Sequence, residues 1–185
     1  MTIKYIIKTA AVYLNITDVI GYLDGTTVSP SSSTLAKTDA LTRLANLTIS
    51  ELAASYAPMV CSEEVETEDG KITFASLTNN ITRILSVKNQ FGHDAEFKIF
   101  PEYIKVFGGR YTIEYEYAPA NYGLTDTVGF SAKITAALLG YGVAAEFCIT
   151  EGRFEEAVLW RKRYTYGVER VALPKSAAIK GRCWL

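Results

Sequence analysis

The spacing of apolar residues predicts helices along the first part of the chain. Between Ile3 and Leu14, apolar side chains recur at intervals of three and four residues, as on the buried face of a helix. The pattern breaks after Leu14. Either Thr17 or Asp18 can accept a hydrogen bond from a backbone N–H and so cap a second short helix, which we expect to end at Leu23.

A polar stretch and then a longer helical pattern follow. Residues 26–34 are rich in serine and predict a flexible or partner-ordered linker. Apolar positions from Leu35 to Ala57 again have helical spacing. Because Pro58 cannot continue a helix, one long helix is expected to end just before it.

The period changes from helical to alternating after Cys61. The acidic residues between Glu63 and Asp69 indicate a solvent-exposed face or loop, with a turn at Asp69-Gly70. Three short strands are expected to follow, at residues 71–75, 82–89 and 95–100.

The strongest strand signal lies between residues 102 and 119. Gly108 and Gly109 separate two extended runs, as in a β-hairpin. In the second run, apolar and polar side chains alternate strictly, so one face is expected to be buried and the other polar. The apolar set is Tyr111, Ile113, Tyr115 and Tyr117, and the polar set is Thr112, Glu114 and Glu116.

Two apolar stripes mark the C-terminal helices. The first runs from Phe130 to Thr150 and covers an arc of about 140° on a helix. The second lies about half a turn out of phase with the first, so one straight helix cannot bury both against the same core. We therefore expect a break at Glu151-Gly152 and a second helix that folds back, an αα-hairpin. The second stripe comprises Phe154, Ala157, Val158, Tyr164 and Val168.

The last helix has two distinct sides. Arg161 lies within the apolar stripe, whereas Leu159 and Tyr166 lie where solvent is expected. In one interpretation these three residues and Arg163 contact a partner, because aromatic residues and arginine are enriched at interfaces. In the other, Arg161 is satisfied by a local carboxylate and Leu159 is simply exposed. The sequence leaves both interpretations open.

Composition narrows the classes of function. A length of 185 residues suits one domain with an inserted subdomain. The net charge of −1 argues against a general nucleic-acid binder, in spite of the basic triplet at residues 161–163. The twelve tyrosines fill strands or surfaces that are buried against partners. A soluble chain without a membrane contact is expected, because an apolar stretch of about 18 residues and a convincing signal peptide are both missing.

No residue pattern predicts catalysis, a metal or a cofactor. Cys61, Cys148 and Cys183 are odd in number and widely spaced, which argues against a disulfide framework or zinc site and for a reducing compartment. His93 is the only histidine, and it lies beside Asp94 in an expected turn without a serine or cysteine motif to complete a triad. The chain is therefore expected not to be an enzyme.

Together these patterns predict an α+β fold. It is expected to be an α-helical bundle with an inserted antiparallel β-sheet region, a C-terminal αα-hairpin and an extended C-terminal tail. The expected parts are a helical domain at residues 1–60 and 120–173, a β subdomain at 61–119 and a tail at 174–185. The tail is basic and ends in Cys-Trp-Leu, which suggests docking on a partner through Lys175, Lys180, Arg182 and Trp184.

The segments Arg110–Pro119 (RYTIEYEYAP) and Phe130–Val171 carry a family resemblance. The first looks like the last inserted strand, and the second like the closing helix pair, of the head-to-tail connector (adaptor) proteins of tailed bacteriophages, especially the tail tubular protein A type. In that pair an Ala-rich helix precedes a short break, and the second helix carries a tyrosine about one turn after its midpoint. The order of helix, linker, long helix, β insert and helix pair is also similar.

The resemblance implies a non-enzymatic structural protein of the virion neck, assembled in the host cytoplasm. Such adaptors form a ring of about twelve subunits under the portal. The ring continues the DNA channel, presents a platform to the next neck or tail protein, and lets DNA pass without sequence-specific binding. No cofactor is implied. A negative channel wall would not hold passing DNA, and its candidate residues are Glu63, Glu64, Glu66, Glu68 and Asp69.

Two alternatives stay open. The chain is either a different neck or tail-completion protein of the same virion, or a non-enzymatic ligand-binding module with the β-sheet as its platform. A well-formed apolar pocket would favour the ligand-binding module, and ring symmetry would favour the connector.

Overall fold

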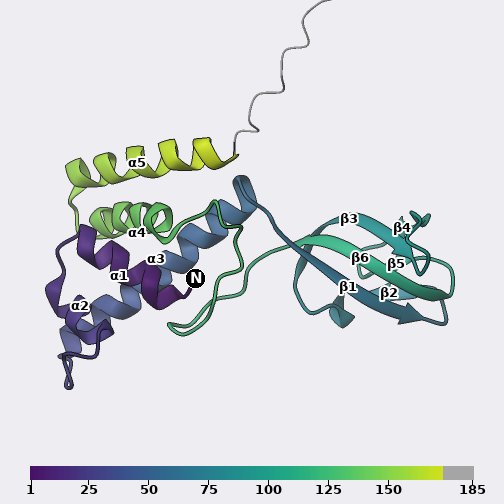
Figure 1. Ribbon diagram of the computed structural model, residues 1–185, viewed down its shortest axis with the longest axis horizontal. Helices are drawn as coiled ribbons and strands as arrows, with labels where there is room; N and C mark the ends of the chain where they lie inside the picture. The colour runs from purple at the N-terminus through teal and green to yellow at the C-terminus, as the bar shows by residue number, and fades with distance from the viewer. Residues whose placement is uncertain (173–185) are drawn as a thin grey trace, which may run out of the picture. The chain divides into compact units, whose positions relative to one another are not determined.

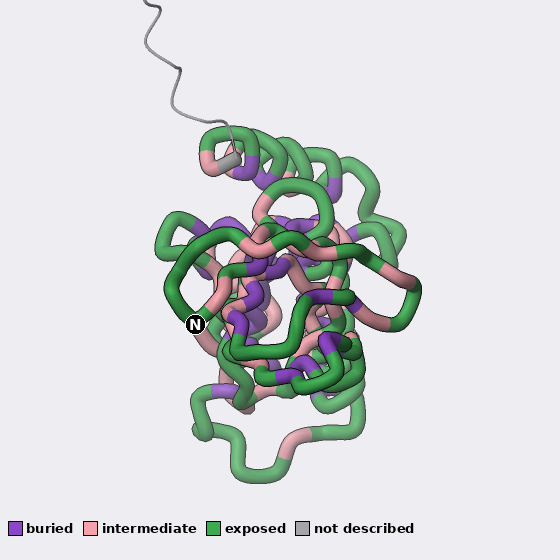
Figure 2. The backbone as a smooth tube through the Cα atoms, turned by 90° about the vertical axis from the view of Figure 1, so that its right-hand side faces the viewer, coloured by how far each residue is buried: buried purple, intermediate pink, exposed green. Residues whose placement is uncertain are grey.

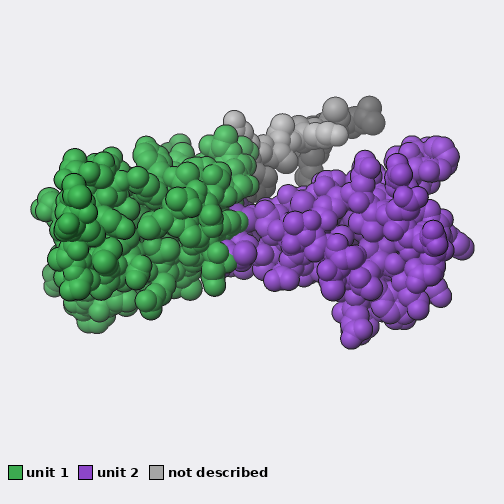
Figure 3. Space-filling view, turned by 90° about the horizontal axis from the view of Figure 1, so that it is seen from below, with its two compact units in different colours: residues 1–49, 121–185 green, residues 50–120 purple. Residues whose placement is uncertain are grey.

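The computed structural model describes residues 1–172, and the chain divides into two compact units. One unit comprises Met1–Ile49 and Asn121–Leu185, and the other comprises Ser50–Ala120 (Figure 3). The first holds most of the helical residues and the second holds the strands, so the mixed α+β class is confirmed. Four residues of the expected tail contact lie outside the described residues: Lys175, Lys180, Arg182 and Trp184.

Five α-helices lie within residues 1–172 (Figure 1): α1 (Ile3–Tyr13), α2 (Thr17–Leu23), α3 (Ser32–Ser55), α4 (Ala136–Thr150) and α5 (Phe154–Ala172). The break after α1 is confirmed, and Asn15 there has a φ of 55°. The cap prediction for α2 is wrong, because Ile16 occupies the cap position and makes no side-chain hydrogen bond. Asp18 instead pairs with the Lys37 ammonium of α3 at 3.1 Å.

Helix α3 begins at Ser32, inside the stretch that the sequence indicated as a linker. The Ser31 hydroxyl accepts the N–H of Thr34 at 3.1 Å, as in a helix cap. Thr34 is buried, and its hydroxyl donates to Asp18 at 3.3 Å. Part of the serine-rich stretch is therefore helical and held against α2. The boundary between the two units falls at Ser50, within α3, rather than after residue 60 as expected.

Ten of the 15 residues of α4 are buried, so the prediction of a single apolar arc is wrong. By contrast, α5, the uppermost helix in Figure 2, is mostly exposed. Helix α4 packs against both α1 and α5. The helix also begins later than the expected residue 130, because Thr135 is its cap and accepts the N–H of Leu138 at 3.2 Å. Its buried residues are Ala136, Leu138, Leu139, Gly140, Gly142, Val143, Ala144, Ala145, Phe147 and Cys148.

The chain breaks between α4 and α5 at the expected position. Glu151 caps α4, and Gly152 has a φ of 71°, a conformation that glycine adopts at helix ends without strain. The expected apolar stripe of α5 is only partly buried. Ala157, Tyr164 and Val168 are buried, but the other two members of the stripe, Phe154 and Val158, are exposed.

Two three-stranded antiparallel sheets form the unit Ser50–Ala120, and this unit lies wholly within the described residues (Figure 1). One sheet has the strand order β1-β6-β3 and the other β2-β5-β4. The strands are β1 (Met59–Thr67), β2 (Lys71–Thr73), β3 (Ile81–Asn89), β4 (Lys98–Ile99), β5 (Tyr103–Lys105) and β6 (Gly109–Tyr117), and a 3₁₀ turn, η1, covers Phe74–Ser76.

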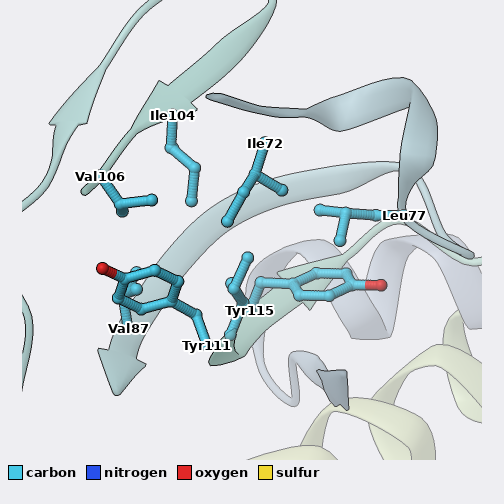
Figure 4. Close-up of a cluster of buried hydrophobic side chains, with 8 residues drawn as sticks. Ile72, Leu77, Val87, Ile104, Val106, Tyr111 and Tyr115 are labelled. Carbon is cyan, nitrogen blue, oxygen red and sulfur yellow. The ribbon is translucent and has the colours of Figure 1, made fainter. Parts of the chain in front are cut away.

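Side chains of both sheets share one apolar core. Figure 4 shows Tyr111 and Tyr115 of β6 lying below Ile72 and Ile104 of the smaller sheet. The strict alternation expected in β6 is confirmed for Tyr111, Ile113 and Tyr115, which are buried. Such burial of large side chains stabilises a small sheet unit by about 1.5–3 kcal/mol for each fully buried side chain.

The hairpin expected at Gly108-Gly109 does not form. Strand β6 pairs with β1 and β3, whereas β5 pairs with β2 and β4. Strand β5 is held to β2 instead, and the Val106 N–H extends that pairing by donating to the Gly70 carbonyl at 2.8 Å. The two glycines therefore carry the chain from one sheet to the other.

Candidate interaction surfaces

Three aromatic rings stack where α1, α4 and α5 meet. The Tyr13 ring centroid lies 4.8 Å from that of Tyr141 and 5.4 Å from that of Trp160. The Arg163 guanidinium lies over Trp160 at 4.9 Å and over Tyr141 at 5.9 Å. Burial and a side-chain hydrogen bond with Tyr141 raise the pKa of Tyr13 to about 12. Arg163 is therefore positioned by aromatic faces as well as by its own helix.

Arg161 agrees with the second interpretation of the sequence, in which a carboxylate of the chain itself satisfies its charge. Its guanidinium donates to the Glu146 carboxylate of α4 at 2.8 Å, and it lies 5.7 Å from the Tyr164 ring centroid. Arg161 thus helps to join α5 to α4. Of the expected contact set, Arg161 and Arg163 thus both make contacts inside the chain.

Leu159 and Tyr166 are exposed on α5, as the sequence indicated. Their exposed fractions are 64% and 62%. Phe154 and Val158 are also exposed. One helix therefore packs on α4 through a narrow stripe and leaves four large apolar side chains in contact with solvent, which is typical of a surface that a partner covers.

A groove of about 500 Å³ lies between α4 and α5. Lys133, Arg163 and Arg170 line it, and Asp and Glu are missing among its described lining residues. Leu138, Tyr141, Tyr166, Gly167 and Val171 also line the groove. Sequence reasoning named only Arg163 and Tyr166 of this set, because Lys133 lies in the loop before α4 and Arg170 a full turn beyond Tyr166. Only the packing of α4 on α5 brings them together.

The five acidic channel candidates do not share one face. Glu63 lies on the inner side of β1 with its carboxylate half-buried, whereas Glu64 and Glu66 lie on the outer side and are exposed. The acidic run is thus mostly a strand rather than a loop. Glu66 pairs with Arg110 at 3.4 Å across the strands. The remaining two, Glu68 and Asp69, lie in the turn after β1.

Glu63 has a structural role in the β unit. Its carboxylate accepts hydrogen bonds from the Tyr115 hydroxyl, from the Thr78 N–H at 3.2 Å and from the Cys61 thiol at 3.6 Å. Burial favours the neutral form of Glu63, but these hydrogen bonds outweigh burial and lower the pKa of its carboxyl. Burial and the bond to Glu63 raise the pKa of Tyr115 to about 12. These contacts therefore indicate that Glu63 stabilises the β unit rather than lining a DNA channel.

We expect Tyr115→Phe to lower the free energy of unfolding by about 1 kcal/mol at pH 7, because it removes a partly exposed hydrogen bond to a charged group. The folded-state pKa of Glu63 is depressed, so its stabilisation is present above its ordinary pKa of about 4.5 and is lost as the pH falls through the lowered value. Urea unfolding at neutral and strongly acidic pH measures this.

Tyr111→Phe is the matched control, since Tyr111 is buried on the same face of β6. The wild type and Tyr115→Phe should converge in acid, and an equal difference between them at both pH values would contradict the assignment.

A pocket of about 790 Å³ opens on the β unit. Phe97, Phe100, Val106 and Phe107 supply apolar walls. Five charged side chains line the same pocket: Glu68, Asp69, Glu96, Lys98 and Lys105. The pocket therefore mixes apolar and charged surface, and it could receive either a small molecule or a side chain of a partner.

His93 lies exposed in the turn after β3, where its backbone N–H donates to the side-chain oxygen of Asn89 at 3.1 Å. Within residues 1–172, Cys61 and Cys148 are free thiols and His, Cys, Asp and Glu side chains form no group of three that could hold a metal. None of the helices in that part of the chain is long and apolar enough to cross a bilayer.

Comparison with known proteins assigns no family. No family model matches the chain, and no curated protein matches it either.

Proposed function

We propose that this chain is a structural virion protein of a tailed phage, a head-to-tail adaptor. In this proposal several copies form a ring, on the order of twelve, below the portal. The ring continues the DNA channel to the next neck or tail protein. The helical unit, with α4 and α5 as its closing hairpin, supplies the ring body, and the basic tail reaches the portal.

The observation that carries the proposal is the one-sided packing of α5. Leu159 and Tyr166 are exposed on a helix whose opposite side is buried on α4. A subunit in a closed ring needs two different contact faces, because ring contacts are heterologous. The exposed side of α5 supplies one of these two faces, because the helix contributes to the core of its own unit and still presents apolar side chains.

The charge distribution adds support. The β unit, Ser50–Ala120, has eleven Asp and Glu against six Lys and Arg, whereas the rest of the chain has nine Asp and Glu against thirteen Lys and Arg. The net charge of −1 hides this opposition. Two oppositely charged units on one chain favour head-to-tail association of copies.

The proposal is tested with the full chain, alone and mixed with purified portal rings of tailed phages, by light scattering and electron microscopy. We expect a ring, either free or formed on the portal. The double variant Leu159→Ser/Tyr166→Ser should weaken assembly on the order of tenfold, because it removes exposed apolar contacts. Val28→Ser, at another exposed apolar side chain, is the control. A chain that stays monomeric and ignores every portal ring would overturn the proposal.

The pocket of the β unit supports a second candidate, a non-enzymatic ligand-binding module. Its volume of about 790 Å³ is large enough for a small molecule. Native mass spectrometry of the chain purified from its expression host would detect a retained ligand. A bound small molecule that is displaced by Lys105→Trp, at an exposed residue of the pocket wall, would favour this candidate over the adaptor.

A further inference from the structure

One end of the larger sheet forms a compact tip. The register pairs Thr67 with Gly109 and Asn89 with Tyr111, so the ends of β1 and β3 and the start of β6 meet there. The tip consists of residues 67–71 and 105–109. Two loops that are distant in sequence thus lie side by side at this end.

Hydrogen bonds hold the tip in one shape. The Asp69 carboxylate accepts from the Lys71 N–H at 3.0 Å and from the Thr67 hydroxyl at 2.9 Å. The Val106 N–H donates to the Gly70 carbonyl at 2.8 Å and ties the second loop to the first. These bonds reduce the conformational entropy that binding would otherwise cost.

This fixed tip presents a phenylalanine to solvent. Phe107 is 80% exposed, although it follows the buried Val106 directly. Glu68 and Glu96 line the same pocket as Phe107 and are exposed. Asp69, Lys98 and Lys105 line this pocket too, so its wall carries three carboxylates against two ammonium groups. A rigid exposed aromatic with acidic neighbours has the character of an anchor residue for a partner site that is apolar inside and basic at its rim.

The groove between α4 and α5 has these complementary features. Gly167 and Leu138 are among its apolar lining residues, and Tyr141 and Tyr166 are its aromatic ones. Lys133, Arg163 and Arg170 supply its positive charge. The groove belongs to the basic unit of the chain and the tip to the acidic unit.

We infer that the tip of one copy docks in the α4–α5 groove of a second copy, with Phe107 inserted between the two tyrosines and its acidic neighbours facing the groove cations. This contact is heterologous, so it joins copies head to tail. The inference deepens the proposed adaptor ring and rests on that function, because it identifies the contact between neighbouring subunits of the ring.

Charge reversal tests the contact in the full chain without any portal. Sedimentation equilibrium at chain concentrations up to about 1 mM detects self-association even where its Kd is near that concentration. We expect a concentration-dependent mass for the wild type. The groove variant Lys133→Glu/Arg170→Glu and the tip variant Glu68→Lys/Glu96→Lys should each weaken association on the order of 100-fold, because like charges then meet. Combining all four substitutions in one chain should restore it, and so should mixing the two variants.

The choice of positions separates binding from folding. Asp69 and Arg163 stay unchanged, because the first holds the tip and the second lies on Trp160. Lys4→Glu/Arg43→Glu, at two exposed cations elsewhere, is the control for charge alone. Phe107→Ser should also weaken association at least tenfold.

Three results would overturn the inference: a wild type that is monomeric throughout, reversals without effect, or a combined variant that is not restored. The adaptor function would still stand if such a chain formed rings on portals. Conversely, association that depends on the tip and groove in a chain that ignores portals would sustain the inference and remove the adaptor function.

Discussion

Gly142→Ala is expected to lower the free energy of unfolding of the helical unit by about 2–3 kcal/mol. An added Cβ would lie 2.5 Å from Thr48 Cγ2 and 3.1 Å from the Tyr164 ring. Thr48 is buried and its hydroxyl donates to the Leu44 carbonyl at 2.9 Å, so it cannot turn away without losing that bond. The overlap outweighs the better helix propensity of alanine, worth about 1 kcal/mol. Urea unfolding followed by helical circular dichroism measures the change.

Gly167→Ala in α5 is the matched control for this prediction. Its added Cβ would lie just as close, 2.5 Å, to Leu138 Cδ1. That atom is the far end of a flexible side chain, so it can move into the groove. We expect a change within about 1 kcal/mol of the wild type, because propensity and a small rearrangement offset each other. Equal losses of the free energy of unfolding in the two variants would contradict the prediction, because Thr48 of α3 would then give way as easily as Leu138.

Gly70→Ala is expected to cost the β unit about 3 kcal/mol or more. Gly70 has a φ of 72°, which costs an alanine roughly 1–2 kcal/mol. The new Cβ would also lie 2.4 Å from the Val106 carbonyl oxygen, a backbone atom. The loops of the tip must then separate, and the hydrogen bond between the Val106 N–H and the Gly70 carbonyl is lost at about 1 kcal/mol. Amide hydrogen exchange of β2 and β5 reports the loss locally.

Gly92→Ala distinguishes strain from overlap. Gly92 has a similar φ of 80°, but nothing lies within 4 Å of the Cβ that would be added. It should therefore cost only about 1–2 kcal/mol. Since Gly70→Ala also displaces the loop that carries Phe107, it should weaken self-association where Gly92→Ala does not. The opposite order of the two variants would exclude the tip as the docking element.

The chain combines two small units of opposite net charge. The helical unit is held by close contacts of α4 with its neighbours, which leaves the outer side of α5 for a partner. The β unit is held by its tyrosine-rich core and a tied tip, which leaves Phe107 in solvent. In both, a firm interior supports an exposed apolar side chain, which is what repeated contacts between copies need.

Local pattern alone determined the existence and type of most elements. The breaks after α1 and after α4, the stop of α3 before Pro58 and the alternation in β6 follow from spacing, glycine and proline. These signals act within a few residues of one another, so they predict the elements without any knowledge of what the chain packs against. The exposure of Leu159 and Tyr166 could also be read from helical phase.

Tertiary structure decided which elements meet. Strand β6 pairs with β1 and β3 instead of β5, because Val106 bonds to Gly70 across the tip. Glu63 meets the Tyr115 hydroxyl only because β1 pairs with β6, and α4 became buried on most sides by contacts with α1 and α5. Lys133, Arg163 and Arg170 form one groove only after α4 and α5 pack. Such outcomes depend on partners distant along the chain, whose contact energy outweighs local preference.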